Sequence, residues 1–169
     1  MTLDDANALP ARDFVVAFGG VFEHSPWVAE RCAGQRPFAT ADAMHAAMMQ
    51  AVRSASEAEQ LVLLRAHPEL AGREATAGTL TTDSTSEQGR LGFTALSRED
   101  LAHVADLNRR YRERFGFPCI VALRLHETRA SVIAEMERRT GAAREDEIAA
   151  ALAQVGHITR GRLARLVSP

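Results

Sequence analysis

The histidine that opens the segment His67-Pro68-Glu69-Leu70-Ala71-Gly72 is well placed for proton transfer. The ordinary pKa of an imidazole lies near neutrality, so His67 can act as a general acid or base at physiological pH. Pro68 restricts the backbone beside it and would help to hold the ring in place. The alternative is structural, because a histidine at the end of a helix can simply cap that end, where a positive charge is favoured.

The segment Ser84-Thr85-Ser86-Glu87-Gln88 gathers hydroxyls, a carboxylate and an amide within one short stretch. Ser84 and Glu87 also have the spacing of a capping box, which predicts a helix that begins at Ser84. The free backbone N–H groups of such a helix start, together with these side chains, suit a small polar ligand and favour an anion. The alternative is a helix start that binds nothing.

The turn Arg114-Phe115-Gly116-Phe117-Pro118-Cys119-Ile120 and the side chain of Arg162 are two further candidates. Gly116 and Pro118 would make the turn rigid, so its main-chain groups could face a ligand, although the same pattern suits core aromatics at a helix end. Arg162 falls on the inward side of the last predicted helix. An inward arginine needs an anionic partner, which is either a carboxylate of the protein or one of a ligand.

Metal, nucleotide and lysine chemistry find no support in the sequence. The other histidines lack the spacing of metal ligands, and neither Cys32 nor Cys119 has a close cysteine partner, so no zinc site is expected. There is no Gly-rich phosphate-binding motif, and all the basic residues are arginine, which excludes Schiff-base catalysis by lysine. We therefore expect neither a metal nor a cofactor.

Helical periodicity dominates the chain and predicts an all-α fold. Helices are expected within 15–22, over 41–54, from Ser56 to before Pro68, from Ser97 to Gly116, and over 128–139 and 144–166. The apolar run Ile120-Val121-Ala122-Leu123 is compatible with a strand or a buried helix. Residues 68–96 are rich in Gly, Thr and Ser and predict a long central loop, which in a compact domain is usually functional or disordered. The expected architecture is one domain over residues 1–169, a compact helical bundle whose central loop carries candidate site residues.

The overall composition is that of a globular domain with balanced charge. The 169 residues include 20 basic and 22 acidic side chains, a formal net charge of −2, which argues against nucleic acid as the main partner. Accordingly, the arginines 109, 110, 112 and 114 are expected to form a solvated helix face. No run of 18 apolar residues occurs, and the N-terminus does not resemble a signal peptide. With two cysteines, the chain is expected in a reducing compartment, the cytoplasm, away from membranes.

Four segments, in order and at matching spacing, resemble the 2-oxo-4-hydroxy-4-carboxy-5-ureidoimidazoline (OHCU) decarboxylase family. The resemblance runs over residues 14–166. The segments that carry it are Gly19-Gly20-Val21-Phe22-Glu23-His24-Ser25-Pro26-Trp27-Val28-Ala29, the hexapeptide that begins at His67, Ser84-x-x-Glu87-Gln88, and Leu107-Asn108-x-x-Tyr111-x-x-Arg114-Phe115-Gly116-Phe117-Pro118.

The resemblance implies a helical enzyme of the third step from urate to allantoin, without cofactor or metal and often a homodimer. It implies that His67 is the catalytic acid/base and that Glu87 works beside it. It further implies that a pocket for a small ureido-imidazoline substrate is lined by Pro68, Ser84, Thr85, Ser86, Gln88 and the main chain of Cys119, Ile120, Val121, Ala122 and Leu123, with Arg162 facing the ligand from the C-terminal helix. Cys119 stands where the family usually has Phe.

Two other functions stay open at this point. A helical protein on the same fold could bind a ureide without turning it over, in which case it would bind allantoin tightly and release no CO2. Alternatively, the arginine-rich chain could be a partner-binding module, although the near-zero net charge supports this poorly. A steep salt dependence of nucleic-acid binding would distinguish the second alternative from the enzyme.

Overall fold

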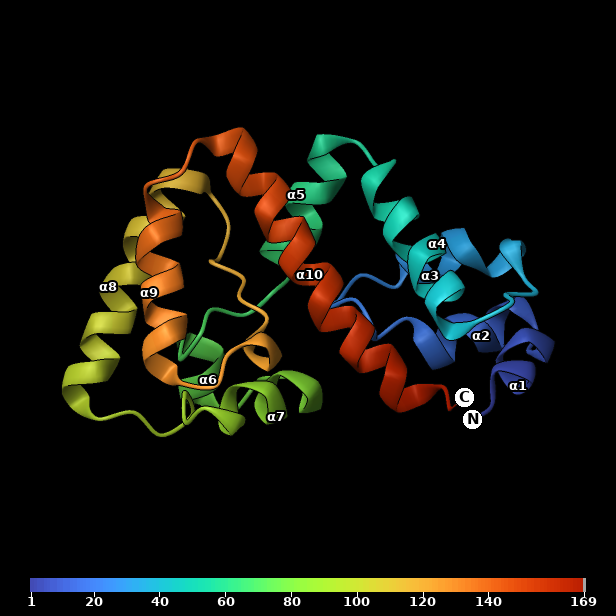
Figure 1. The fold of residues 1–169 in the computed structure, drawn as a ribbon, viewed down its shortest axis with the longest axis horizontal. Coiled ribbons are helices and arrows are strands. Elements are labelled where there is room, and N and C mark those ends of the chain that lie inside the picture. The colour runs from blue at the N-terminus through green and yellow to red at the C-terminus, as the bar shows by residue number, and fades with distance from the viewer. Residues whose placement is uncertain (169) are drawn as a thin grey trace. The chain divides into compact units, whose positions relative to one another are not determined.

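A computed structural model describes residues 1–168 and confirms that the protein is all-α (Figure 1). Its α-helices are α1 (Leu3–Ala8), α2 (Ala11–Phe18), α3 (Trp27–Cys32), α4 (Ala41–Arg53), α5 (Glu57–Arg65), α6 (Arg73–Ala77), α7 (Thr82–Arg90), α8 (Arg98–Phe115), α9 (Arg129–Thr140) and α10 (Arg144–Leu166). Two 3-10 helices, η1 (Ala33–Gln35) and η2 (Leu123–Leu125), complete the described elements. Over the same residues, β pairing is confined to an isolated bridge between Thr2 and Ser168.

The chain groups into two compact units, which we describe separately. The first unit contains Met1–Ala66 and the chain from Gly156 onward, and the second contains His67–Val155. Helix α10 contributes its first part to the second unit and its last part to the first. None of the helices in residues 1–168 combines the length and apolar character that crossing a bilayer requires.

The first unit is built from α1–α5 and the end of α10, with α3 and α4 packed side by side (Figure 1). Helix α5 begins with the expected capping box, in which the Ser56 hydroxyl accepts from the Glu59 amide and the Glu59 carboxylate accepts from the Ser56 amide. Helix α2 ends at Phe18, so Val21 and Phe22 are buried after its end rather than within it. Large buried side chains of this unit include Phe14, Phe18, Phe22, Met44, Met48, Leu63 and Leu64.

The second unit packs α8 against α9 and gathers aromatic rings at the end of α8 (Figure 1). As predicted, Ser97 caps the start of α8, and Gly116 ends it in the left-handed region at φ +79°. The rings of Tyr111 and Phe115 lie 4.7 Å apart, and Phe117 lies edge-on to Tyr111 at 5.8 Å. The turn at Gly116 therefore carries the chain from α8 directly into a buried aromatic cluster.

The central region, residues 68–96, differs from the long loop that the sequence predicts, because it contains α6 and α7. The hydroxyl of Thr81 accepts from the Ser84 amide at 3.2 Å and caps α7. The helix thus begins before Ser84, and the predicted capping box at Ser84 and Glu87 is wrong. The earlier cap produces a longer helix, one face of which buries both Ser84 and Gln88.

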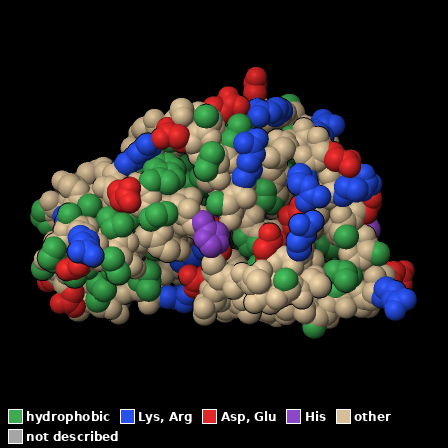
Figure 2. Space-filling model, turned by 180° about the vertical axis from the view of Figure 1, so that it is seen from behind, with side chains coloured by type: hydrophobic (Ala, Val, Ile, Leu, Met, Phe, Trp, Pro, Cys, Tyr) green, Lys and Arg blue, Asp and Glu red, His purple; other side chains and the backbone are tan. Residues whose placement is uncertain are grey.

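The run Ile120–Leu123, left open between strand and helix, is neither. It continues as irregular buried chain into the single turn of η2. Outside these buried parts, exposed arginines pair with acids, either on the same helix, as Arg109 does with Asp106 and Glu113, or on another element, as Arg160 does with Asp42. Figure 2 shows Arg side chains close to Asp and Glu side chains at several places on one face, consistent with the balanced composition. The exposed arginines of α8 form the solvated face that the sequence predicts.

Candidate functional site

His67 is buried, with 6% of its surface exposed, and begins the second unit just after α5. The residues that follow form a compact turn, which we call the His67 turn (residues 67–72). Ala71 adopts a left-handed conformation at φ +47°, which is unusual for a residue other than glycine and costs about 1–3 kcal/mol unless its surroundings impose it. Such strain calls for bonds that hold the turn in this shape.

Those bonds come from the side chains of α7 and α8. Gln88 uses both ends of its amide: Oε1 accepts from the Ala71 amide at 2.9 Å, and Nε2 donates to the Glu69 carbonyl at 3.2 Å. The amide of Asn108 donates to the Leu70 carbonyl at 2.9 Å. Three successive residues of the His67 turn are therefore fixed by side chains. The first two candidate segments of the sequence are brought together through Gln88.

Helix α7 presents its candidate residues on different sides. Ser84 and Gln88, four residues apart, lie on the buried face, and Glu87 beside them is half-buried. Thr85 and Ser86 are exposed, and the Thr85 hydroxyl donates back to the Thr81 carbonyl at 2.9 Å. The buried face of α7 thus carries a hydroxyl and an amide toward the interior of this unit, with the Glu87 carboxylate at its edge.

The main chain that the resemblance assigns to the pocket is buried throughout, since Cys119, Ile120, Val121, Ala122 and Leu123 are each at most 4% exposed. In the candidate turn Arg114–Ile120 that leads into it, Arg114 and Gly116 are exposed and the other residues are buried. We call residues 119–126 the main-chain segment, because its side chains are mostly apolar and its polar groups belong to the backbone. Three side chains from three helices bind that backbone.

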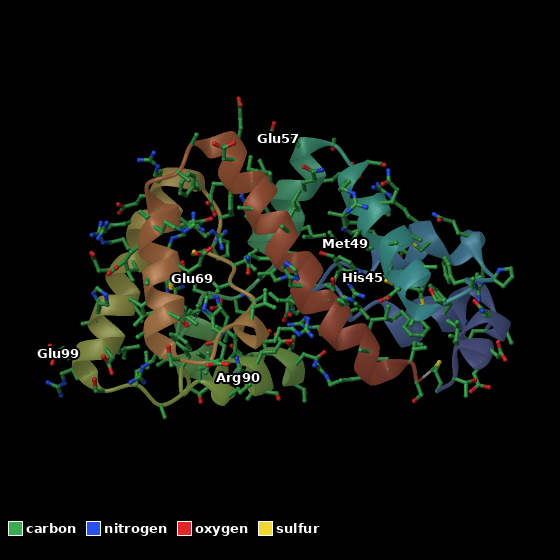
Figure 3. The ribbon with its side chains drawn as sticks, in the orientation of Figure 1. His45, Met49, Glu57, Glu69, Arg90 and Glu99 are labelled. Atoms are coloured by element: carbon green, nitrogen blue, oxygen red, sulfur yellow. The ribbon has the colours of Figure 1, made fainter. Side chains whose placement is uncertain are left out.

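Arg139 of α9 donates to the Ile120 carbonyl at 2.6 Å, and Gln154 of α10 accepts from the Ala122 amide at 2.8 Å. Arg90 of α7, labelled with Glu69 in Figure 3, donates to the carbonyls of Leu123 and His126. Within residues 1–168, the amide N–H groups of Ile120 and Val121 meet no acceptor. Buried N–H groups are rarely left in this state, so the segment offers donors suited to a polar ligand.

A buried polar cluster lies behind the main-chain segment. Arg139 and Glu147 are each 1% exposed, and the Arg139 Nε donates to Glu147 Oε1 at 2.8 Å. Tyr111 donates its hydroxyl to the same carboxylate, and burial is the largest cause that raises its pKa. Burial also raises the pKa of the Cys119 thiol to about 12, so this cysteine stays protonated and does not act as a nucleophile.

Arg162, predicted to face inward, is indeed buried in the first unit, with 3% of its surface exposed. Its Nη1 donates to Glu23 Oε2 at 2.6 Å, so one partner is a carboxylate of the protein. Glu23 comes from the Gly19–Ala29 motif that the sequence singled out. This ion pair links two distant sequence motifs inside one unit.

Sequence reasoning missed the side chains that support the site. Arg139 follows another arginine near the end of a helix and has the appearance of a surface residue, while Arg90 and Gln154 carry no motif. Gln88, Asn108 and Tyr111 did belong to quoted motifs. Within residues 1–168, no group of three His, Cys, Asp or Glu side chains is arranged to hold a metal ion.

Comparison with known proteins places these features in a family. The model of the OHCU decarboxylase family matches residues 7–164. The chain is 42% identical to 2-oxo-4-hydroxy-4-carboxy-5-ureidoimidazoline decarboxylase of Haloferax volcanii, covering 99% of this chain and 97% of that protein. It is 36% identical to the protein of the same name from Mus musculus, covering 99% and 93%.

Two solved structures share the fold. A crystal structure of (S)-allantoin synthase matches with a TM-score of 0.79 at 29% identity, covering 99% of this chain and 54% of that one. A crystal structure of OHCU decarboxylase in the presence of (S)-allantoin matches with a TM-score of 0.69 at 20% identity, covering 93% and 98%. The second likeness establishes a shared fold and nothing finer.

Proposed function

Because the chain belongs to the OHCU decarboxylase family, we propose that it converts 2-oxo-4-hydroxy-4-carboxy-5-ureidoimidazoline to (S)-allantoin and CO2. The likeness to the named relatives extends over nearly the whole of each protein, which supports a complete activity rather than a shared fragment. The chain is thus a carboxy-lyase, and its ligand is a small ureido-imidazoline. A homodimer in the cytoplasm, built from a single family domain, is part of this proposal.

The reaction needs no external electron sink. The substrate carries its carboxylate on a ring carbon that also bears a hydroxyl and lies next to a C=N bond. When the bond to the carboxylate breaks, its electron pair forms a double bond to the neighbouring carbon, and the C=N pair moves onto nitrogen, which takes up a proton. The C=N bond of the substrate therefore accepts the electron pair, a role that a cofactor has in other decarboxylases.

His67 is the proposed acid/base, and Glu87 the residue that works beside it. This assignment is supported by the two hydrogen bonds that the Gln88 side chain makes to the His67 turn, because Gln88 lies on the same helix as Glu87. His67 would handle the proton of the substrate hydroxyl while the carboxylate is held away from water. General acid–base help of this kind typically contributes about 10² to 10⁴ in rate.

The binding groups of the proposed pocket fall into two sets within the second unit. The His67 turn and α7 contribute Pro68, Ser84, Thr85, Ser86 and Gln88. The main chain of residues 119–123 contributes backbone groups, supported by the buried Ile120 and Val121 amides, which meet no acceptor in residues 1–168. Arg162 is proposed separately as a ligand-facing arginine, on the resemblance alone; its Nη1 donates to Glu23 Oε2.

The handedness of the allantoin product is set after CO2 has left, when the intermediate is protonated. Loss of CO2 leaves an enol-like intermediate, and allantoin forms when the enol oxygen loses its proton and the carbon bearing the ureido group gains one. In free solution both faces of that carbon are equivalent, so the product is racemic. A protein that delivers the proton to one face produces one enantiomer.

The test compares catalysis with simple binding. The substrate is generated in place from urate by the two enzymes that act before this one, and CO2 release is followed with and without the protein. We expect release well above the unassisted rate, and a His67→Asn variant that returns it to that rate. Tight binding of allantoin by calorimetry with no added CO2 release would replace the enzyme by the ureide-binding alternative.

A further inference from the structure

The guanidinium of Arg139 joins three parts of the second unit at one buried point. It donates to Glu147 of α10 through Nε and to the Ile120 carbonyl through Nη1, at 2.8 and 2.6 Å. Its Nη2 also reaches the Tyr111 hydroxyl of α8 at 3.4 Å. Because Arg139 itself belongs to α9, this single side chain fixes one backbone carbonyl relative to three helices.

Stability alone explains this cluster poorly. Taking an arginine and a glutamate out of water is costly, and apolar residues of similar volume often stabilise a protein equally well. The planar guanidinium does, however, offer several donors in a fixed fork, which apolar residues cannot supply. One edge of the fork holds the Glu147 carboxylate while another holds the Ile120 carbonyl, so the geometry favours an orienting role.

The peptide group that Arg139 holds also contains a candidate ligand donor. The Ile120 carbonyl and the Val121 N–H belong to the same planar trans peptide and point in opposite directions. Fixing the carbonyl on Arg139 therefore fixes the N–H, which faces away from the guanidinium. That Val121 N–H is among the buried amides of the segment that meet no acceptor in the described chain.

Gln154 acts on the next peptide group in the same way. It holds the Ala122 N–H at 2.8 Å, which turns the Val121 carbonyl in the opposite direction. Within these two peptide groups, the donor and the acceptor that remain thus both belong to Val121. A donor and an acceptor side by side are the complement of a ureido group, which carries both N–H and C=O.

We propose that Arg139, paired with Glu147, is a positioning residue that aims the Val121 main chain at the ureido part of the substrate. This rests on the proposed function, because it assumes a ureido-imidazoline ligand at the main-chain segment. Arg139 touches no reacting atom in this account. It acts through the Ile120 carbonyl, and its loss weakens binding and lets the intermediate take up its proton from either face.

The test removes both charges together, so that no buried charge is left alone. Arg139→Met/Glu147→Gln keeps the volume of both side chains and lacks the donor to Ile120. The matched control is Arg138→Met/Glu135→Gln, which removes the neighbouring ion pair of the same helix, between an exposed arginine and a half-buried glutamate. For each variant, folding is checked by circular dichroism, and kcat, KM and the enantiomeric purity of allantoin are measured.

We expect the buried double variant to fold, to lose on the order of 10- to 100-fold in kcat/KM with a raised KM, and to give partly racemic allantoin. The surface control should match the parent protein in all three. A purely structural cluster would lower the melting temperature and leave KM and enantiomeric purity unchanged. That result overturns the proposal.

Two further measurements separate the possible failures. Arg139→Lys keeps a positive charge beside Glu147, but one ammonium cannot replace the fork, so kcat/KM and enantiomeric purity should again fall. Parental values in that variant contradict positioning. If the parent protein shows no turnover, the proposed function fails instead. Calorimetry with (S)-allantoin then still decides the positioning role, because equal affinity of the parent and the double variant overturns it.

Discussion

The His67 turn and the main-chain segment are held by the same kind of bond but present different groups. Side-chain amides from α7 and α8 bind residues 69–71 of the turn, and side chains from α7, α9 and α10 bind residues 120–126 of the segment. The turn presents an imidazole. The segment presents backbone N–H and C=O groups between apolar side chains.

This difference decides what each region tolerates. In the turn, the chemistry depends on the identity of His67, so one substitution removes it. In the segment, the groups that would meet a ligand are backbone N–H and C=O groups, which do not depend on the side chain at that position. The residues whose identity matters there are the ones whose side chains hold the backbone in place. Substitutions in one region at a time should therefore have separable effects on turnover and on stability.

Replacing the imidazole should have the largest effect. His67→Asn keeps a polar side chain of similar size but cannot exchange protons near neutrality, so we expect kcat to fall by about 10² to 10⁴. Turnover is measured as allantoin formed above the unassisted background. A variant with near-parental kcat would remove His67 from the mechanism and leave the turn as a structural feature.

Removing only one partner of the buried ion pair that supports the main-chain segment should mainly lower the stability of the protein. Arg139→Met alone leaves the 1%-exposed Glu147 carboxylate buried with its cationic partner removed, and we expect a loss of about 3–5 kcal/mol in unfolding free energy. Urea unfolding measures this. The double variant Arg139→Met/Glu147→Gln should recover most of the loss, and a single variant as stable as the parent would contradict the buried ion pair.

Breaking the support of the turn should cost less. Gln88→Leu removes both bonds to the turn and leaves the Ala71 amide and the Glu69 carbonyl without them, which we expect to cost about 1–3 kcal/mol and to lower kcat. Unfolding and turnover are measured on the same sample. Gln35→Leu, at an exposed glutamine of the first unit, is the control and should change neither. Unchanged turnover in Gln88→Leu would separate the turn from catalysis.

The smallest expected effect is a change in the mobility of the main-chain segment, which labelling of the Cys119 thiol can measure. Burial raises the pKa of Cys119 to about 12 and that of Cys32, in the first unit, to about 11, so both should react slowly in the native protein. In Arg139→Met/Glu147→Gln, labelling followed by peptide mass spectrometry should show faster reaction at Cys119 only. Equal acceleration at both cysteines would indicate general unfolding rather than release of the segment.

The sequence predicted well those features that depend on local patterns. The capping residues Ser56 and Ser97, the stop at Gly116 and the inward side of Arg162 all follow from spacing within one helix, and the structure confirms them. The reactive candidate His67 could be found because its type alone suggests its chemistry. Its catalytic role remains a prediction.

The supporting side chains could not be predicted, because their partners are distant in sequence. Arg139 and its neighbour Arg138 are indistinguishable by composition, yet one is 1% exposed and the other pairs with Glu135 at the surface. Only the packing of α8, α9 and α10 separates them. The start of α7 was misplaced for a different reason, since Thr81 and Ser84 both fit the cap and the helix uses the earlier one.

The handedness of the product tests the central claim most directly. Circular dichroism is recorded while the unstable substrate is generated from urate in the presence of this protein. The account predicts a strong signal of (S)-allantoin that appears only when the protein is added, since the unassisted reaction gives a racemate without signal. Racemic allantoin in the presence of the folded protein would contradict it.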